Sequence, residues 1–201
     1  MLAGMHMRMY FSLLHAQMAA FHARSAAGMP LDGSEEAAIA LSAHVSGAVM
    51  CASAFIEATA NELSEKDEKA NALSRLNKIL IDANVEAMNE SDTTFHSAKT
   101  LFDLRNRLTH YKHDWLDWGT KDMVGPNNLY DSPLYERLQS SFEFLPASVH
   151  YIPRFLSPDC ALWAITSATS FLDDFYTRLG MRPNHDHLRD RIEVNRLWQG
   201  S

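Results

Sequence analysis

The sequence is poor in the residues that interrupt or cross-link small folds. Its 201 residues include 8 glycines, 7 prolines and 2 cysteines. Cys51 and Cys160 alone can build neither a disulfide framework nor a four-ligand zinc site, which favours a reducing compartment. The chain has no glycine-rich phosphate loop, and no strand–turn–helix setting for a serine hydrolase. Those two classes of enzyme site therefore find no support.

Positive charge and long apolar runs are also scarce. With 18 Lys and Arg against 25 Asp and Glu, the formal net charge is −7, whereas a general nucleic-acid binder is expected to be basic. The methionine-rich N-terminus is interrupted by His6, Arg8 and His15 and lacks a clear cleavage site. We find no run of about 20 apolar residues. We therefore expect a cytoplasmic protein with no membrane partner, in which any contact with RNA must be local.

What is abundant is hydrophobic sequence at helical spacing. Hydrophobic residues make up 46% of the chain, enough for one domain with a sizeable core. Apolar spacing and cap residues predict long helices over about residues 2–26, 34–63, 65–89, 93–112 and 158–180, and a short one over about residues 135–144. The clearest single face consists of Leu41, Val45, Ala48, Ala52, Phe55, Thr59 and Leu63.

The remaining segments read as connections. Prolines recur through residues 114–157 and predict an irregular insertion before the last core helix. Residues 181–201 are polar and rich in arginine, typical of a tail. The expected fold is therefore an all-α antiparallel helical bundle of about five helices, forming a single domain over residues 1–180.

One short segment combines a phosphate binder with a proton carrier. Arg105, Asn106 and His110 fall within six residues of the fourth predicted helix. An arginine carries a permanent charge that binds phosphate, and an imidazole exchanges its proton near neutral pH. On a regular helix Arg105 and His110 diverge by about 140°. Either the helix ends or distorts near His110, or two chains pool their copies across a two-fold axis.

This segment is a basic island in an acidic chain. Asp103 is the single acid among the basic residues Lys99, Arg105, Arg107, Lys112 and His113. In a dimer the doubled island would form a groove suited to a phosphate backbone. An ordinary solvated face explains Arg107 and Lys112 equally well. Arg105 lies close to the apolar stripe and needs a partner or a cleft, so a structural ion pair with Glu57 is the alternative for it.

Residues 104–110, preceded by Phe102, resemble the Arg-x(4–6)-His signature of the HEPN superfamily of small helical proteins. Residues 54–63, which contain Glu57, resemble the Glu-containing helix often found upstream in these proteins. The resemblance covers residues 34–113 and, more weakly, the helix after Pro158. It implies a helical bundle, usually dimeric and often a metal-independent endoribonuclease in toxin, phage-defence or RNA-processing systems.

The resemblance also implies roles. Arg105 would hold or stabilise the phosphate, His110 would act as general acid or base, and Asn106 would orient the phosphate or His110. The RNA 2′-hydroxyl would be the nucleophile, leaving a 2′,3′-cyclic phosphate. No metal or cofactor is implied; the partners would be RNA, a second copy and an antitoxin or other partner protein. Some HEPN toxins carry a tyrosine two residues after the histidine. Here Tyr111 follows His110 directly and Lys112 takes the next place, which puts that mode of control in question.

Other interpretations remain open. His185 with His187 resembles half of a metal site, and His110 with His113 shares a helix face, but neither pair has a third ligand that we can name. The insertion carries aromatic residues that could stack on bases or simply anchor a loop; these are Trp115, Trp118, Tyr130 and Tyr135. The acidic charge and this aromatic insertion favour a second hypothesis, a non-catalytic HEPN-like module that dimerises or binds a partner or nucleotide.

Overall fold

The computed structural model describes residues 10–30, 34–64, 70–110, 115–116, 123–124, 132–146 and 153–194. The helices in these ranges are α1 (Phe11–Ala27), α2 (Glu35–Leu63), α3 (Ala72–Asp82), α4 (Thr93–Thr109), α5 (Pro133–Ser141), α6 (Pro158–Arg178), the 3-10 turn η2 (Asp186–Leu188) and α7 (Arg189–Ile192). The strands β1 (Trp115–Leu116) and β2 (Met123–Val124) pair antiparallel, Trp115 opposite Val124. The expected all-α bundle is confirmed.

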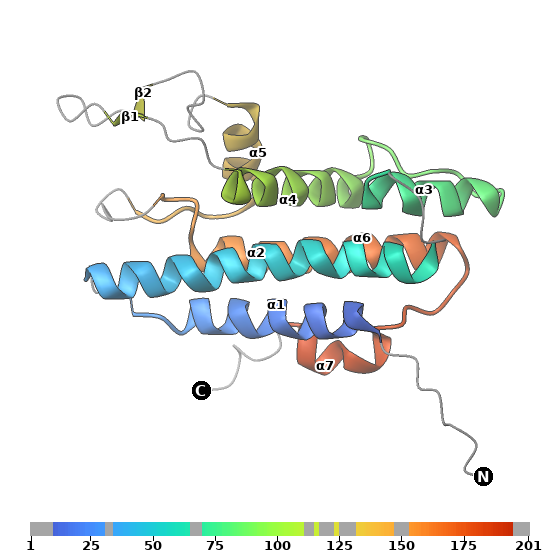
Figure 1. Cartoon of the computed structure of the whole chain (residues 1–201), viewed down its shortest axis with the longest axis horizontal. Helices are drawn as coiled ribbons and strands as arrows, with labels where there is room; N and C mark the ends of the chain where they lie inside the picture. The colour runs from blue at the N-terminus through green and yellow to red at the C-terminus, as the bar shows by residue number, and fades with distance from the viewer. Residues whose placement is uncertain are drawn as a thin grey trace, which may run out of the picture.

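Helix α2 runs through the centre of the bundle. It contacts α1, α3, α4 and α6, and Figure 1 shows α1 on one side of it, α3 and α4 on the other, and α6 alongside. Helices α1 and α4 run opposite to α2 and α6 (Figure 1). Short α7 packs on α1, and α5 packs on α4. Helices α1 and α4 are therefore separated by the α2–α6 layer.

The helix starts follow the capping chemistry of the sequence. Ser34, Asn71, Ser132 and Ser157 each use a side-chain oxygen to accept a backbone N–H three residues on. Glu35 and Glu36 lie in the first turn of α2, where the helix dipole favours acids. At the other end of α6, Gly180 adopts a left-handed φ of +65°, which ends the helix where the sequence predicted.

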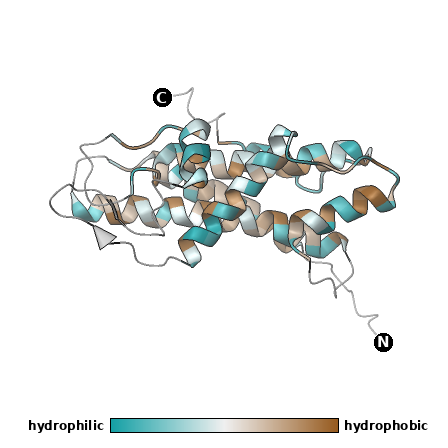
Figure 2. Cartoon of the chain, turned by 90° about the horizontal axis from the view of Figure 1, so that it is seen from above, coloured by the Kyte–Doolittle hydropathy of each residue, from teal (hydrophilic) through white to brown (hydrophobic). Residues whose placement is uncertain are grey.

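The core is formed by the predicted face of α2 and by the aromatic side of α6. Of the seven residues predicted on one α2 face, six are buried and Leu63 is partly buried. From α6, Ile165, Phe171, Leu172 and Phe175 are essentially inaccessible. Hydrophobic and hydrophilic residues alternate along the long helices (Figure 2), as expected when each helix has one face in the core.

Several predicted boundaries are wrong. The first helix begins at Phe11 because Tyr10 is extended, and residues 2–9 lie outside the described ranges. The third predicted helix, residues 65–89, is reduced to Ala72–Asp82, because Asn71 caps its start and Asn84 has a left-handed φ of 59° after its end. Residues 65–69 are outside the described ranges.

Two more ends differ by a few residues. Helix α4 ends at Thr109 rather than near residue 112, with His110 as its C-cap. The short helix predicted over residues 135–144 is α5, Pro133–Ser141, and Pro133 occupies its first turn. Its Arg137 donates to Asp103 of α4 at 2.8 Å and to Thr100 at 3.2 Å. This part of the predicted insertion is therefore anchored on α4.

The predicted tail, residues 181–201, is folded onto the bundle over its described part. His185, Ile192 and Val194 are buried. The His185 Nε2 lies 2.9 Å from Asp173 Oδ1, and Arg189 donates two hydrogen bonds of 2.6 Å to the Asp173 carboxylate. Polar composition misled the prediction here, because the polar side chains pair with a carboxylate of α6 rather than with water.

The fully buried positions of helix α1 are all small residues, while the His22 ring lies between helices, close to Gly47 and to His44 of α2. The buried positions of α1 are Ser12, Ala16, Ala19, Ala20, Ala23 and Ala26. Four of its large apolar residues, Phe11, Leu14, Met18 and Phe21, are exposed, and Leu13 is partly buried. Small side chains let α1 approach the bundle closely, so no space remains on its inner face for a larger one.

Two sequence expectations concern membranes and thiols. Helix α2 is long and apolar enough to span a membrane by length and composition, which corrects the expectation that no such segment exists; in this fold it is the central helix.

Cys51 is partly buried against the core and Cys160 is fully buried, and both are free thiols. Burial raises the pKa of both thiols, which suits packing rather than nucleophilic chemistry.

We predict that Ala20→Leu lowers the free energy of unfolding by about 1–3 kcal/mol, because the larger side chain must be accommodated on a closed inner face. Leu14→Ala on the same helix is the matched control; Leu14 is 49% exposed, so we expect a change within about 0.5 kcal/mol. Urea unfolding measures both. Equal effects of the two substitutions would contradict the described packing of α1.

A second prediction concerns pH. Burial raises the pKa of the Asp173 carboxyl, but the hydrogen bonds and charges of His185 and Arg189 together outweigh it, so the pKa lies below its ordinary value. A lowered folded-state pKa contributes stability that is present above the unfolded pKa and lost as pH falls through the folded one. We expect Asp173→Asn to lower the free energy of unfolding by about 1–3 kcal/mol at pH 7. The difference between variant and wild type should disappear as pH falls below about 3.9.

Urea unfolding of wild type and variant across this pH range makes the measurement. Asp82→Asn is the control, since Asp82 belongs to an exposed i,i+4 pair with Lys78 and should give a small gap throughout. A gap for Asp173→Asn that does not change with pH would show that the carboxylate charge is not what holds the C-terminal segment.

Candidate functional site

The candidate site is built on the C-terminal half of α4. Arg105 lies there with 23% of its side chain exposed and forms an ion pair with Glu57 of α2 through Nη2. Its Nη1 donates to Asn106 Oδ1 at 3.0 Å, and its guanidinium carbon is 5.7 Å from the centre of the Phe102 ring. Three neighbours therefore hold the guanidinium in one orientation.

These contacts explain why an arginine is tolerated beside the apolar stripe of α4. Leu101 and Leu104 are fully buried on that stripe, and Glu57 supplies the countercharge that Arg105 needs there. The ion pair that the sequence offered as the alternative for Arg105 is present. It does not close the site, because Glu57, Arg105 and Asn106 all line an open cleft of about 420 Å³.

His110 marks the end of α4. Its backbone N–H donates to the Asn106 carbonyl at 2.9 Å, and its φ and ψ of −115° and 32° leave the helix. The residue is exposed. The first of the two geometric solutions, a helix that ends near His110, is thus met. Within the described residues no interaction joins His110 to Arg105, so the ending does not by itself bring the two together.

The cleft lies between α2, α3 and α4. Besides Glu57, Arg105 and Asn106 it is lined by Ala70, Asn71, Ala72, Leu73, Arg75, Lys99, Phe102 and Asp103. Its volume falls within the usual range of about 300–1,000 Å³ for small-ligand sites. The cleft has room for a phosphate with part of its nucleotide, and the Phe102 ring offers an apolar surface beside the cations.

Most charges at the cleft already have partners. Asp103 pairs with Arg137 at 2.8 Å, Glu57 with Arg105, and Lys99 with Glu90. The hydrogen bond and charge of Lys99 lower the pKa of the Glu90 carboxyl. Lys99 therefore reaches the cleft as half of an exposed pair, which salt and solvent weaken.

Arg75 is the residue that the sequence reasoning missed. It comes from α3, lines the cleft, and donates from Nη1 to Asn61 Oδ1 at 2.5 Å and to Ser64 Oγ at 3.3 Å. In the part of the chain that the structure describes, Arg75 pairs with no carboxylate, and its Nε is buried with no acceptor. Arg75 follows Ala72 by three residues and precedes Ile79 by four, a position beside the apolar stripe of the kind that singled out Arg105.

The other predicted contacts separate into three groups. Arg107 is partly buried and does not line the cleft. Tyr111, Lys112 and His113 lie outside the described ranges. Of the aromatic residues, Tyr135 packs edge-on against Phe144 with 5.2 Å between ring centres, anchoring α5. Trp118 and Tyr130 fall outside the described ranges, as does the side chain of Trp115.

The two histidine pairs considered as metal ligands differ from the sequence picture. His185 is buried on Asp173 and stacks edge-on against Phe55 with 5.2 Å between ring centres. It is a structural residue, which corrects its interpretation as half of a metal site. His113, the partner of His110, is not described. Among the described residues no group of three or more His, Cys, Asp and Glu is placed to hold a metal ion.

We predict that Glu57 and Arg105 are energetically coupled. In a double-mutant cycle of Glu57→Gln and Arg105→Gln we expect a coupling free energy of about 0.5–1 kcal/mol from urea unfolding, modest because both groups are partly exposed. The Lys78–Asp82 pair, with side chains 58% and 62% exposed, provides a matched cycle with an expected coupling of about 0.3 kcal/mol. Additive effects at Glu57 and Arg105 would contradict the described ion pair.

Comparison with known proteins adds no assignment: no family model, no curated protein and no solved structure matches this chain.

Proposed function

We propose that this protein is a metal-independent endoribonuclease of the HEPN type, acting as a homodimer on RNA in the cytoplasm. The single observation that carries the proposal is the open cleft at Arg105 and Asn106, one turn before an exposed His110 on the same helix. The motif resemblance supplies the reaction class, and a toxin or phage-defence role belongs to the same proposal.

The reaction needs only proton transfer and charge stabilisation. A general base removes the proton of the 2′-hydroxyl, the oxygen forms a bond to phosphorus, and the bond from phosphorus to the 5′-oxygen breaks. The leaving oxygen takes up a proton, and the products are a 2′,3′-cyclic phosphate and a 5′-hydroxyl. His110 is the proton carrier, and Arg105 stabilises the charge that develops on the phosphate oxygens.

Glu57 and Asn106 act as positioning residues in this proposal. The ion pair and the 3.0 Å hydrogen bond keep the Arg105 guanidinium from searching other rotamers, so less ordering remains to be done when the phosphate arrives. Arg105 has five donors, and the described contacts leave some of them for the phosphate. This resolves the tension between the ion pair and a catalytic role.

Arg75 adds a second cation to the proposed site. Because it pairs with no carboxylate among the described residues, a phosphate can bind it without displacing an acid. It would bind the RNA backbone on the α3 side of the cleft while Arg105 contacts the scissile phosphate. This assignment is also compatible with the acidic net charge, because two arginines at one cleft provide a local contact for RNA on a protein that is negative overall.

The dimer supplies what one chain lacks. Arg105 and His110 point about 140° apart on an ideal helix, and no described contact joins them. Pairing two chains through the region of the α4 end would place His110 of one copy near Arg105 of the other. An isologous interface then gives two equivalent sites.

The test is cleavage of a 5′-labelled single-stranded RNA with EDTA present. We expect Arg105→Ala to lower the rate by about 10²–10³-fold and His110→Ala by about 10²–10⁴-fold. Arg75→Ala should raise KM more than it lowers kcat, since it removes a binding contact. Arg182→Ala is the control, because Arg182 is an exposed arginine outside the cleft.

Circular dichroism and thermal midpoints show whether each variant folds. Arg105→Lys is the conservative variant: it keeps a positive charge beside Glu57, whereas Arg105→Ala leaves the Glu57 carboxylate without a countercharge. Absence of cleavage by folded wild type across several RNAs, or equal rates for all variants, would contradict the proposal. A 3′-phosphate formed without a cyclic intermediate would contradict the mechanism alone.

A second function is favoured by the Arg105–Glu57 ion pair itself. If the pair is purely structural, the cleft serves a non-catalytic module that binds a nucleotide or a partner. In that case folded wild type leaves RNA intact, yet binds a labelled nucleotide with an affinity that falls in Arg75→Ala. The same set of variants therefore separates the two functions.

A further inference from the structure

Helix α1 presents its large apolar side chains to solvent. Phe11, Leu14, Met18 and Phe21 are 58%, 49%, 39% and 56% exposed. They follow one another at steps of three, four and three residues, the spacing of the a and d positions at which two helices pack. We call these four residues the outer α1 face.

A helix that is apolar on opposite sides is normally covered on both. The inner side of α1 is covered by the bundle through alanines and Ser12. The outer α1 face carries two phenylalanines, a leucine and a methionine, and contiguous exposed groups of this kind mark contact surfaces rather than ordinary solvent-exposed helix. Its heptad spacing indicates that the molecule covering it is a helix.

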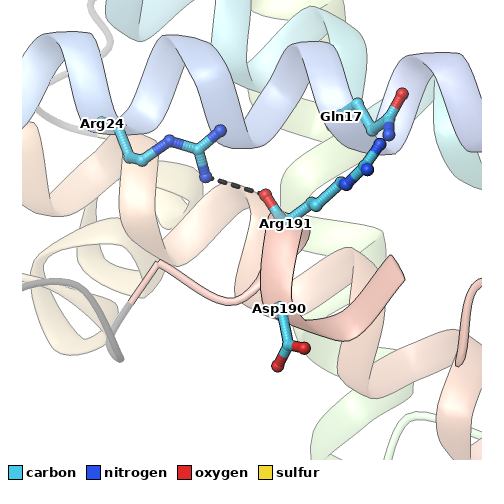
Figure 3. A pocket seen from close by; sticks show the side chains of 4 residues that line it. All are labelled: Gln17, Arg24, Asp190 and Arg191. Atoms are coloured by element: carbon cyan, nitrogen blue, oxygen red, sulfur yellow. Dashed lines mark hydrogen bonds between the residues drawn. The ribbon is translucent and has the colours of Figure 1, made fainter. Parts of the chain in front are cut away.

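One edge of the outer α1 face is basic. Gln17 and Arg24 of α1 and Arg191 of α7 line a pocket of about 430 Å³ together with Asp190 (Figure 3). Arg24 donates to the Arg191 backbone carbonyl at 2.8 Å, and the Arg191 side chain extends towards Gln17 while Asp190 points away from α1 (Figure 3). Neither guanidinium bonds a carboxylate within the described residues.

This edge selects the occupant. With Phe11 and Met18 at a positions, Gln17 and Arg24 occupy g positions, which face the e or g positions of a packed helix. Helix α1 contains no Asp or Glu. A second α1 would therefore set Arg24 against neutral or basic side chains, whereas a helix with carboxylates along its edge would pair with Arg24 and Arg191.

The position of α1 in the fold separates this surface from the cleft. Helices α2 and α6 lie between α1 and α4 (Figure 1). A dimer formed through the outer α1 face would leave the two copies of Arg105 on opposite outer sides. The outer α1 face is thus not the interface that would complete the proposed active site.

We propose that the outer α1 face binds an amphipathic helix of a partner protein, one with an apolar a/d seam and with Asp or Glu along the edge that meets Arg24 and Arg191. The apolar seam supplies most of the affinity, and the acidic edge sets the orientation and the choice of partner. This surface is independent of the ribonuclease proposal and stands whether or not the protein cleaves RNA.

The probes are two fluorescein-labelled synthetic peptides, each about three heptads long with leucine at a and d. One carries glutamate at every e and g position and the other lysine, so that like charges keep each peptide from pairing with itself. By fluorescence anisotropy at about 0.15 M salt, which screens the long-range effect of the net charge of −7, we expect the full chain to bind the glutamate peptide about tenfold more tightly than the lysine peptide.

The variants test the two parts of the surface separately. Arg24→Glu combined with Arg191→Glu should reverse the preference between the peptides while leaving the apolar seam intact. Met18→Asp should abolish binding of both peptides. Ile81→Asp is the matched control, because Ile81 is an apolar residue of α3 that is 59% exposed outside this face, and it should bind as wild type does. Thermal midpoints confirm that all variants fold.

Three results would overturn the proposal. The first is equal affinity for the two peptides, or no binding of either. The second is a wild-type dimer in sedimentation equilibrium that Met18→Asp dissociates, which would assign the outer α1 face to a second copy. The third is co-flotation with phosphatidylglycerol vesicles that Met18→Asp removes, which would assign it to a lipid surface.

Discussion

The structure depends on burying α2. This helix is long and largely apolar, and its apolar side chains are buried in a globular fold only if other helices cover it on several sides. Each covering helix brings something of its own. Helix α4 brings Arg105, whose charge is acceptable at that depth because α2 carries Glu57. Helix α1 covers the bundle mainly through alanines, and four of its large apolar side chains face outward. The cleft and the outer α1 face are therefore two consequences of how one helix is covered.

The parts of the fold that could be predicted are those in which local signals agree. Ser34 at the start of α2, Pro158 at the start of α6 and Gly180 after its end are local features that fix helix ends by themselves. One prediction missed a local signal: the third helix ends before residue 89 because Asn84 adopts a left-handed φ and Val85 donates to the Leu80 carbonyl, a helix ending that asparagine supports. Other predictions were wrong where tertiary contacts decide. The C-terminal segment looked like a tail because its pairing with Asp173 is not visible in its own composition.

The site divides in the same way. The Arg105–Glu57 pair could be anticipated because a charged residue beside an apolar stripe needs a partner, and Glu57 lies on the helix expected to be adjacent. Arg75 satisfied the same criterion on α3 and was overlooked because it belongs to no motif. The relation of His110 to Arg105 could not be predicted, since it depends on how α4 ends and, in the proposed dimer, on where the second chain lies. The spacing of residues along one helix predicts which of them share a face, but it does not predict which face of another helix or of a second chain packs against it.

The central claim is that Arg105 of one copy and His110 of another act on the same phosphate. Mixing purified Arg105→Ala and His110→Ala proteins under conditions that exchange subunits tests it directly. A mixed dimer would contain one complete site, with Arg105 from one chain and His110 from the other, so cleavage should return in the mixture although each variant alone is inactive. If wild type cleaves RNA while the mixture stays as inactive as its components, the site is contained within one chain and the shared-site account is wrong.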